Sequence, residues 1–105
     1  MSYVSIVQVT VKPGRGDEVE RAIEQVLRLR HEWLQSGDLI ASRAIRSTDG
    51  TEYALVSSWK DQAAHDRHEN DAQEQKILAQ FASALASPPR ELSGPIIGSL
   101  GSLSR

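Results

Sequence analysis

The sequence predicts an α+β fold, a ferredoxin-like βαββαβ sandwich built on one antiparallel sheet. With 105 residues the chain has room for one domain and one modest core. Strand patterns and helix patterns follow one another in the order strand, helix, strand, strand, helix, strand. An Asp-Gly pair between the two middle strands favours a tight antiparallel hairpin. This order is the split βαβ arrangement of ferredoxin-like folds.

Four segments carry a strand pattern, because β-branched and aromatic residues gather there between turn residues. They are expected at Tyr3–Val11, Leu39–Ser47, Glu52–Trp59 and Glu91–Ile97. The middle two flank Thr48-Asp49-Gly50-Thr51 and should pair with each other. The fourth is the weakest. Gly94 loosens a strand and Pro95 cannot donate to a ladder, so this segment belongs at an edge or a bend.

The long helix is expected from Glu18 to Gln35. Asp17 and Glu20 have the spacing of a capping box at its start, and Ser36-Gly37 supplies a C-terminal stop. Its apolar stripe consists of Val19, Ala22, Ile23, Val26, Leu27, Trp33 and Leu34. Such a stripe is typical of a helix that packs one face against a core.

A second helical region, in two pieces, follows the third strand. Asp61 can cap a short helix that carries Ala64, His65 and His68, and Asp71 with Glu74 repeats the capping-box spacing for another. The second piece places Ile77, Leu78, Phe81 and Leu85 on one face and ends at Ser87-Pro88-Pro89. Residues 99–105 have a Gly/Ser linker composition, so we expect a domain at 1–98 with a short C-terminal tail.

The composition excludes several classes of protein. With 14 acidic and 12 basic residues the formal net charge is −2, so nucleic acid is not an expected partner. The absence of cysteine excludes disulfides, thiolate nucleophiles and Cys-based zinc sites. The first residues do not resemble a signal peptide, and no run approaches the roughly 20 apolar residues of a transmembrane helix. We therefore expect a soluble cytoplasmic protein with no membrane partner.

Both faces of the predicted sheet carry apolar side chains. In the first strand Val7, Val9 and Val11 lie on one face, while Val4 and Ile6 lie on the other. The third strand divides its apolar residues between the faces in the same way. Two helices cover only one face, so the other should be buried against a second sheet. The sequence therefore predicts a homodimer with face-to-face sheets.

Trp59 and His68 are the strongest candidates for a functional pocket. Trp59 ends a strand, and His68 lies one helical turn after Ala64 on the same face of the next helix. The imidazole should therefore point toward the sheet face that carries Tyr53, Leu55, Ser57 and Trp59. An indole and an imidazole placed there can bind a flat aromatic molecule. The alternative is an ordinary core, in which Trp59 fills space and His68 is a partly buried histidine.

These residues resemble the antibiotic biosynthesis monooxygenase family of dimeric α+β barrels. The resemblance rests on Trp59, Asp61, Ala64 and His68, after a first strand that ends Val-Lys-Pro-Gly and a Ser-Thr-Asp-Gly hairpin, and it covers most of the chain. The family includes cofactor-independent oxygenases of polyketide anthrones and quinols, haem-degrading enzymes and signal-molecule isomerases. The resemblance thus implies a fold more firmly than a reaction.

The resemblance also implies roles for particular positions. His68 would correspond to the axial ligand of the haem-degrading branch, but that branch's first-strand Asn is replaced here by Val7. The polyketide branch carries an Asn four residues before its Trp, and here that position is Leu55. Haem degradation is therefore disfavoured, while haem binding stays open.

The leading hypothesis is a cofactor-independent monooxygenase that acts on an electron-rich aromatic, a quinol or a polyketide anthrone, with O₂ as co-substrate. His68 is the expected base, because an imidazole with a pKa of about 6.5 accepts a proton at neutral pH. Trp59 would stack on the ring, and Arg30 or Tyr53 would contact its oxygen. The further substrate-binding candidates are Leu55, Ser57, Val7 and Phe81. Two alternatives are a dimer that binds haem or a small aromatic without turnover, and a non-catalytic stress-related dimer.

Arg30 falls near the middle of the apolar stripe of the long helix. The favoured interpretation is that its stem covers apolar surface while the guanidinium reaches water. The functional alternative is that Arg30 stabilises a phenolate or enolate oxygen. No metal site is expected, because the acidic and histidine residues of the second helical region do not place three ligands on one helical face. These residues are His65, Asp66, His68, Glu69 and Asp71.

Overall fold

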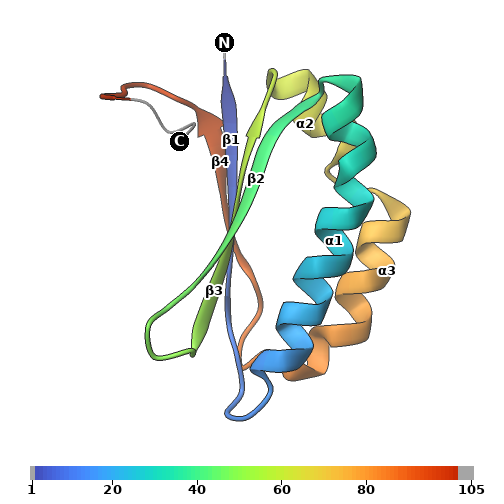
Figure 1. The fold of residues 1–105 in the computed structure, drawn as a ribbon, viewed down its shortest axis with the longest axis vertical. Helices are drawn as coiled ribbons and strands as arrows, with labels where there is room; N and C mark the ends of the chain where they lie inside the picture. Colours follow the sequence, from blue (N-terminus) through green and yellow to red (C-terminus); the bar gives the residue numbers. More distant parts are fainter. Residues whose placement is uncertain (1, 102–105) are drawn as a thin grey trace.

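The computed structural model describes residues 2–101, in which four strands form one antiparallel sheet with helices on one face (Figure 1). The strands are β1 (Tyr3–Thr10), β2 (Leu39–Arg46), β3 (Glu52–Trp59) and β4 (Arg90–Pro95). The helices are α1 (Gly16–Ser36), α2 (Gln62–His68), α3 (Ala72–Phe81) and the 3₁₀ turn η1 (Ala82–Ala84). The strand order β2-β3-β1-β4 confirms the predicted ferredoxin-like α+β class.

Differences between the predicted and observed bounds have local causes. β1 ends at Thr10 rather than Val11, because Val11 makes only an isolated bridge to Leu85. The helix expected to reach Leu85 instead ends at Phe81 and continues as the 3₁₀ turn η1. β4 begins one residue earlier than expected and ends at Pro95. It pairs with β1 alone and lies at the edge of the sheet, as its glycine and proline predicted.

The predicted capping box of α1 is wrong. The helix begins at Gly16, so Asp17 lies inside the first turn, and Arg15 at the cap position makes no side-chain cap hydrogen bond. Glu20 has a different partner: it accepts a hydrogen bond from the Tyr53 hydroxyl at 2.6 Å. The first turns of the long helix are thereby tied to the start of β3 rather than to their own backbone.

The other predicted ends and turns are confirmed. Gly37 ends α1 with a positive φ of 87°, a conformation that glycine adopts without strain. Asp61 and Asp71 accept hydrogen bonds from the first turns of α2 and α3 at 2.8 and 3.0 Å. In the hairpin Gly50 has a φ of 74°, and Asp49 accepts hydrogen bonds from both Ser47 and Thr51. These bonds hold the pKa of the Asp49 carboxyl at about 2.

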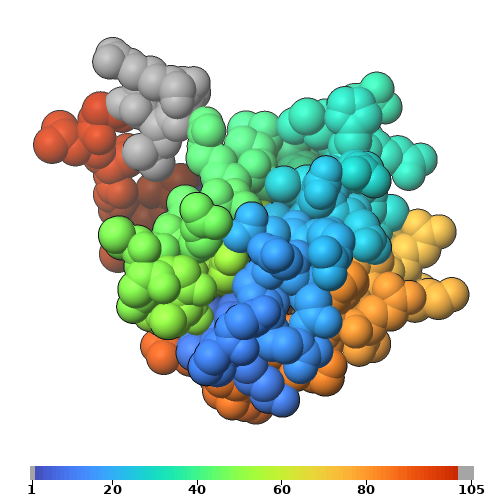
Figure 2. All heavy atoms as spheres, turned by 60° about the horizontal axis from the view of Figure 1, so that its bottom comes forward, coloured from blue at the N-terminus to red at the C-terminus, as the bar shows by residue number. Residues whose placement is uncertain are grey.

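Helices α1 and α3 lie side by side over one face of the sheet (Figures 1 and 2). The register of β1 on β3 puts Val7 opposite Leu55 on the helix-facing side and Ile6 opposite Val56 on the other side. Within residues 2–101 no element covers that second face, where Leu92 and Ile45 are 70% and 60% exposed. The predicted division of apolar residues between two faces is confirmed, and the homodimer stays a prediction.

The buried residues form two separate clusters on the helix-facing side. The aromatic cluster consists of Tyr3, Trp33, Leu39 and Trp59, at the end of the sheet where α1 finishes. The second cluster consists of Val11, Val19, Tyr53 and Ala84, where α1 begins, with Val9, Ile23 and Leu85 packed against it. The middle of the sandwich, between these clusters, holds the site described below.

None of the helices within residues 2–101 is long and apolar enough to cross a bilayer. The C-terminal tail expected at 99–105 lies mainly outside the described residues, and its first three residues belong to no helix or strand. The predicted domain boundary at residue 98 stays a prediction.

Candidate functional site

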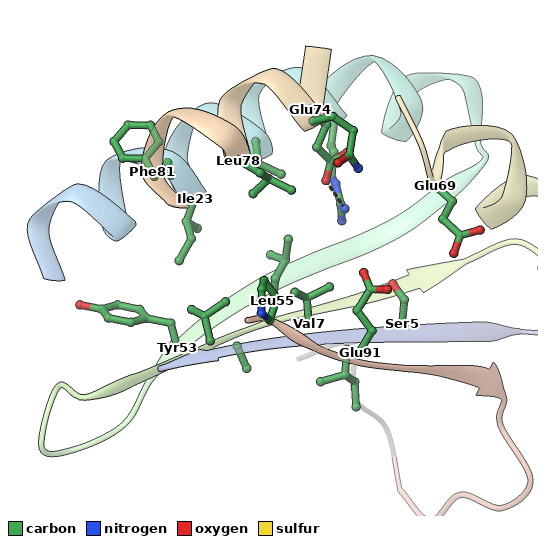
Figure 3. Close-up of a pocket in the computed structure, with 18 of the residues that line it drawn as sticks. Ser5, Val7, Ile23, Tyr53, Leu55, Glu69, Glu74, Leu78, Phe81 and Glu91 are labelled. Atoms are coloured by element: carbon green, nitrogen blue, oxygen red, sulfur yellow. Dashed lines mark hydrogen bonds and ion pairs between the residues drawn. The ribbon is translucent and has the colours of Figure 1, made fainter. Parts of the chain in front are cut away.

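A cavity of about 600 Å³ lies between the sheet and the helices (Figure 3). Its floor is the helix-facing side of β1, β3 and β4, and its roof is α1 and α3. Apolar side chains dominate the walls: Val7, Val9, Ile23, Val26, Leu55, Leu78 and Phe81. Ligand pockets for drug-sized molecules occupy about 300–1,000 Å³, so a molecule of two or three fused rings fits this volume.

The cavity exists because α3 packs on α1 rather than on the sheet beneath it. Apart from Glu91, the inward side chains of β1 and β4 that line the cavity are valines and serines, which are too short to fill the gap. Figure 3 shows Val7 and Leu55 rising from the sheet while Leu78 and Ile23 point down from the helices, with space between them.

A row of serines crosses the sheet beneath the cavity. The strand registers align Ser93 with Ser5, Ser5 with Ser57, and Ser57 with Ser42, one residue from each strand. All four side chains lie on the helix-facing side. Ser5 and Ser93 line the cavity, whereas Ser57 is almost fully buried. The row places hydroxyl groups along a floor whose other side chains, apart from Glu91, are mainly apolar.

Arg30 lies inside the sandwich, so the interpretation that its guanidinium reaches water is wrong: the residue is 8% exposed. Its Nη1 donates to Ser57 Oγ at 2.7 Å and to Ser42 Oγ at 3.3 Å, and its Nη2 donates to Glu74 Oε1 at 2.6 Å. The Nε–H is buried without a partner among the described residues. Arg30 therefore joins α1, the serine row and α3 at one point.

Trp59 is closed in by its neighbours and is 2% exposed. The Arg30 guanidinium lies 5.5 Å from its ring centroid, and the His65 ring meets it edge-on at 5.5 Å. Its indole N–H donates to Ser5 Oγ at 3.0 Å. Trp33 packs beside it at 6.1 Å. The indole thus forms the end wall of the cavity and presents little free face to a ligand.

His68 is held between a ring and a carboxylate. Its imidazole stacks on Trp33 with ring centroids 4.2 Å apart, and its Nε2 lies 3.0 Å from Asp38 Oδ2. Hydrogen bonds from Arg67 and then His68 lower the pKa of Asp38 to about 2, so the carboxyl is ionised. An ionised carboxylate only accepts, so Nε2 carries the proton and a neutral His68 keeps its lone pair on Nδ1.

Comparison with known proteins fixes the family. Residues 2–80 match the antibiotic biosynthesis monooxygenase family. The chain belongs to this family. No curated protein sequence matches it.

Solved structures share the fold of this antibiotic biosynthesis monooxygenase family member at low identity. The Rv0793 protein of Mycobacterium tuberculosis is 16% identical with a TM-score of 0.76, over 99% of this chain and 100% of that chain. The NE2512 protein of Nitrosomonas europaea, whose function is unknown, is 19% identical with a TM-score of 0.76, over 98% and 96% of the two chains. A structure described as an antibiotic biosynthesis monooxygenase is 17% identical with a TM-score of 0.74, over 93% and 100%.

The remaining predicted site residues of this family member are placed differently from one another. Val7, Leu55 and Phe81 line the cavity. Tyr53 also contributes to its wall, but its hydroxyl donates to Glu20, and this bond raises the pKa of Tyr53. Ser57 reaches Arg30 rather than open space. The predicted set is therefore gathered around one cavity, with its polar atoms largely bonded to one another.

The sequence interpretation missed several residues that shape the site. Trp33 was visible only as part of an apolar stripe, and Glu74 only as part of a capping box. Asp38 follows the helix stop with no local signal of its bond to His68. Ser5 and Glu91 do have a signal, since strand alternation places both on the inward face.

The structure gathers three potential metal ligands on α2 and the turn after it. One ligand atom from each of His65, Asp66 and Glu69 lies within 4.8 Å of the others, although the spacing argument predicted no such group. His65 Nδ1 is already 3.0 Å from Asp66 Oδ1, and both carboxylate residues are exposed. Exposed carboxylates beside a histidine are common on helix surfaces, and the absence of a metal stays a prediction.

Proposed function

We propose that this family member is a cofactor-independent monooxygenase that binds an electron-rich aromatic, a quinol or an anthrone, in the cavity between the sheet and α3. The observation that carries the proposal is the cavity itself: about 600 Å³, walled mainly by apolar side chains and bordered by His68. A dry pocket, a base and a site for O₂ are what such a reaction needs from a protein.

The chemistry relies on the substrate as the reductant. Removal of a proton from an anthrone or quinol gives an electron-rich anion that transfers an electron directly to O₂. For an anthrone the ring CH₂ becomes C=O: one oxygen atom forms the carbonyl, and the other leaves as water with both hydrogens. The substrate supplies all four electrons, so the balance requires no flavin or metal.

His68 is the base in this proposal, and Asp38 is its positioning residue. The Asp38 carboxylate accepts a hydrogen bond from Nε2–H of His68. The lone pair on Nδ1 of the neutral imidazole is then available to take the substrate proton. The same bond stabilises the imidazolium that results, as in other carboxylate-oriented histidines. Stacking on Trp33 fixes the plane of the ring.

Trp59 and Arg30 act as structural parts of the site in this proposal. Trp59 closes the end of the cavity, and the Arg30–Glu74 pair holds α3 at its height above the sheet. Because Glu74 neutralises the guanidinium, Arg30 contributes a fixed dipole more than a free charge. Val7, Leu55 and Phe81 supply the apolar walls that exclude water from the anion and from O₂.

Oxygen consumption with a quinol or an anthrone, with chelator present and no flavin added, tests this function. We expect turnover by the wild type, a loss of roughly 100-fold or more in His68→Gln, and a smaller loss in Asp38→Asn. His31→Gln is the matched control, because His31 is an exposed histidine on α1 away from the cavity. Turnover in His68→Gln equal to that of the control would remove the assigned base.

We also propose that two copies pair through their uncovered sheet faces. Val4, Ile6 and Val56 form a central apolar strip on that face, flanked by the exposed Leu92 and Ile45. Burying such a strip is worth roughly 25 cal/mol per Å². Sedimentation should give a dimer at micromolar concentration, and Val56→Glu should give a folded monomer. A monomeric wild type would refute the pairing.

A further inference from the structure

We propose that the cavity selects an uncharged, hydroxyl-bearing aromatic and holds its hydroxyl where Ser5, Ser93 and Glu91 meet. The inference rests on the proposed function, because it takes the cavity as the ligand site and names the class of ligand. It concerns binding rather than turnover, so each can fail without the other.

Glu91 points into the sandwich from the edge strand. In the register of β4 on β1 it lies opposite Val7, whose side chain is on the floor of the cavity. Figure 3 shows the Glu91 side chain rising from β4 beside Ser5, on the same side of the sheet as the helices. Ser93, two residues on, lies on that side too and also lines the cavity. The corner therefore combines a carboxylate with two hydroxyls.

The hydroxyl of Ser5 accepts one hydrogen bond but does not donate its own O–H to any described residue. Its Oγ is buried and accepts the indole N–H of Trp59 at 3.0 Å, and no acceptor for its own O–H is present among the described residues. A buried hydroxyl of this kind favours a ligand that offers an acceptor. A phenolic hydroxyl suits both Ser5 and Glu91. Its oxygen accepts a hydrogen bond from the Ser5 hydroxyl, and its O–H donates a hydrogen bond to the Glu91 carboxylate.

The charges around the cavity oppose an anionic ligand. Three carboxylates line it, those of Glu69, Glu74 and Glu91. Of the described lining residues only Arg30 carries a permanent positive charge, and Glu74 already pairs with it at 2.6 Å. A ligand carboxylate would therefore meet Glu69 and Glu91 without a free cation to balance it. The described lining residues likewise offer no free cation to a haem propionate.

A second explanation of Glu91 must be separated from this one. Inward-pointing charges on edge strands prevent a sheet from pairing with another edge. In that case Glu91→Gln would change the self-association of the protein and leave ligand selectivity unchanged. The ligand class proposed above requires instead that Glu91→Gln change the ligand selectivity.

Calorimetric titration with naphthol and with naphthoate tests the inference, because the two probes share a ring system and differ in charge. We expect the wild type to bind naphthol at least about tenfold more tightly than naphthoate. Glu91→Gln should reduce the ratio of the two affinities roughly fivefold. The substitution removes a negative charge that repels naphthoate, and it also weakens the hydrogen bond from the naphthol hydroxyl. Glu69→Gln should reduce the ratio less, and the exposed Glu32→Gln should leave it unchanged.

Equal affinities for the two probes, or a ratio that neither Glu91→Gln nor Glu69→Gln changes, would overturn the ligand class. Failure of naphthol to bind at all would refute both the ligand class and the proposed cavity. Selective binding without oxygen consumption would support the ligand class and refute only the monooxygenase reaction. Both variants change exposed side chains, and a thermal melt verifies that each remains folded.

Discussion

The two halves of the helix-facing side differ sharply in how they are filled. At the end where α1 finishes, two tryptophans, two histidines and Tyr3 pack ring against ring with centroids 4.2 to 6.1 Å apart. Toward β4 and beneath α3, the floor consists of valine, serine and glutamate, and a cavity of about 600 Å³ remains. Both halves rest on the same sheet and under the same long helix.

The difference teaches how one small domain can be both stable and hollow. Large flat rings fill the space where α1 lies close to β2 and α2 lies close to β3, so the aromatic half supplies one of the two buried clusters. The short valine and serine side chains of β1 and β4 leave the space under α3 unfilled, and α3 is supported from α1 instead. The Arg30–Glu74 pair lies at the boundary between the halves and links them.

The largest difference should come from truncating one large side chain in each half. Trp59→Ala should lower the free energy of unfolding by about 3–5 kcal/mol, because Trp59 is fully enclosed. Leu78→Ala should cost less than about 1.5 kcal/mol, because Leu78 is 46% exposed and faces the cavity. Urea denaturation measures both. Equal losses would contradict the division into a filled half and an open half.

Breaking the buried pair at the boundary should have the next largest effect. Arg30→Met leaves the Glu74 carboxylate buried without its partner and should cost about 3 kcal/mol. The double variant Arg30→Met with Glu74→Leu should return to within about 1 kcal/mol of the wild type, because neither charge is then stranded. A double variant no more stable than Arg30→Met would show that the hydrogen bonds from Arg30 to the two serines contribute more to stability than its ion pair with Glu74.

Adding volume sharpens the same comparison. Ala64 on α2 is completely buried in the aromatic half, so Ala64→Leu should cost about 1–3 kcal/mol through overpacking. Ala79 on α3 borders the cavity, so Ala79→Leu should change stability by less than about 0.5 kcal/mol while weakening naphthol binding. Thermal melts and calorimetric titration separate the two effects. Strong destabilisation by Ala79→Leu would mean that the cavity is not truly open.

Acid pH should affect the aromatic half through the Asp38 carboxyl. The pKa of Asp38 falls from its usual value of 3.8 to about 2, because Arg67 and His68 donate to the ionised form. Because the pKa of Asp38 is lower in the folded chain than in the unfolded chain, its ionised carboxyl stabilises the fold at pH values above the unfolded pKa. This contribution is lost as the pH falls through about 2. Asp38→Asn should make the free energy of unfolding depend less on pH between these two values. The difference between the variant and the wild type should be smaller in high salt, which screens the charges. An unchanged pH dependence at low salt would contradict the assigned bonds.

Much of the fold could be predicted from the sequence, because its signals are local. Strand alternation fixed the inward faces of β1 and β3, and Gly37, Asp61 and Asp71 marked helix ends through chemistry that acts within a few residues. The capping box at Asp17 failed because a long-range bond, from Tyr53, gave Glu20 a different role. Local patterns do not reveal which polar groups meet across the sandwich.

The site was harder to predict for the same reason. Arg30 in an apolar stripe has two physical solutions, to reach water or to find buried partners, and only the approach of Glu74 from α3 decides between them. His68 was expected to face a pocket beside Trp59, but Trp33 and Asp38 fix its ring from two directions. The cavity depends on the height of α3 above the sheet, which no local pattern encodes.

The most direct test of the account is to map a naphthol titration by NMR. If the open half is the ligand site, the methyl signals of Val7, Val9 and Leu78 should shift most, and the indole N–H of Trp33 should move little. The outer-face methyls of Val4 and Ile6 should also stay in place. Dominant shifts at Trp33, which does not line the cavity, or on the outer face would contradict the claim that the ligand occupies the cavity beneath α3.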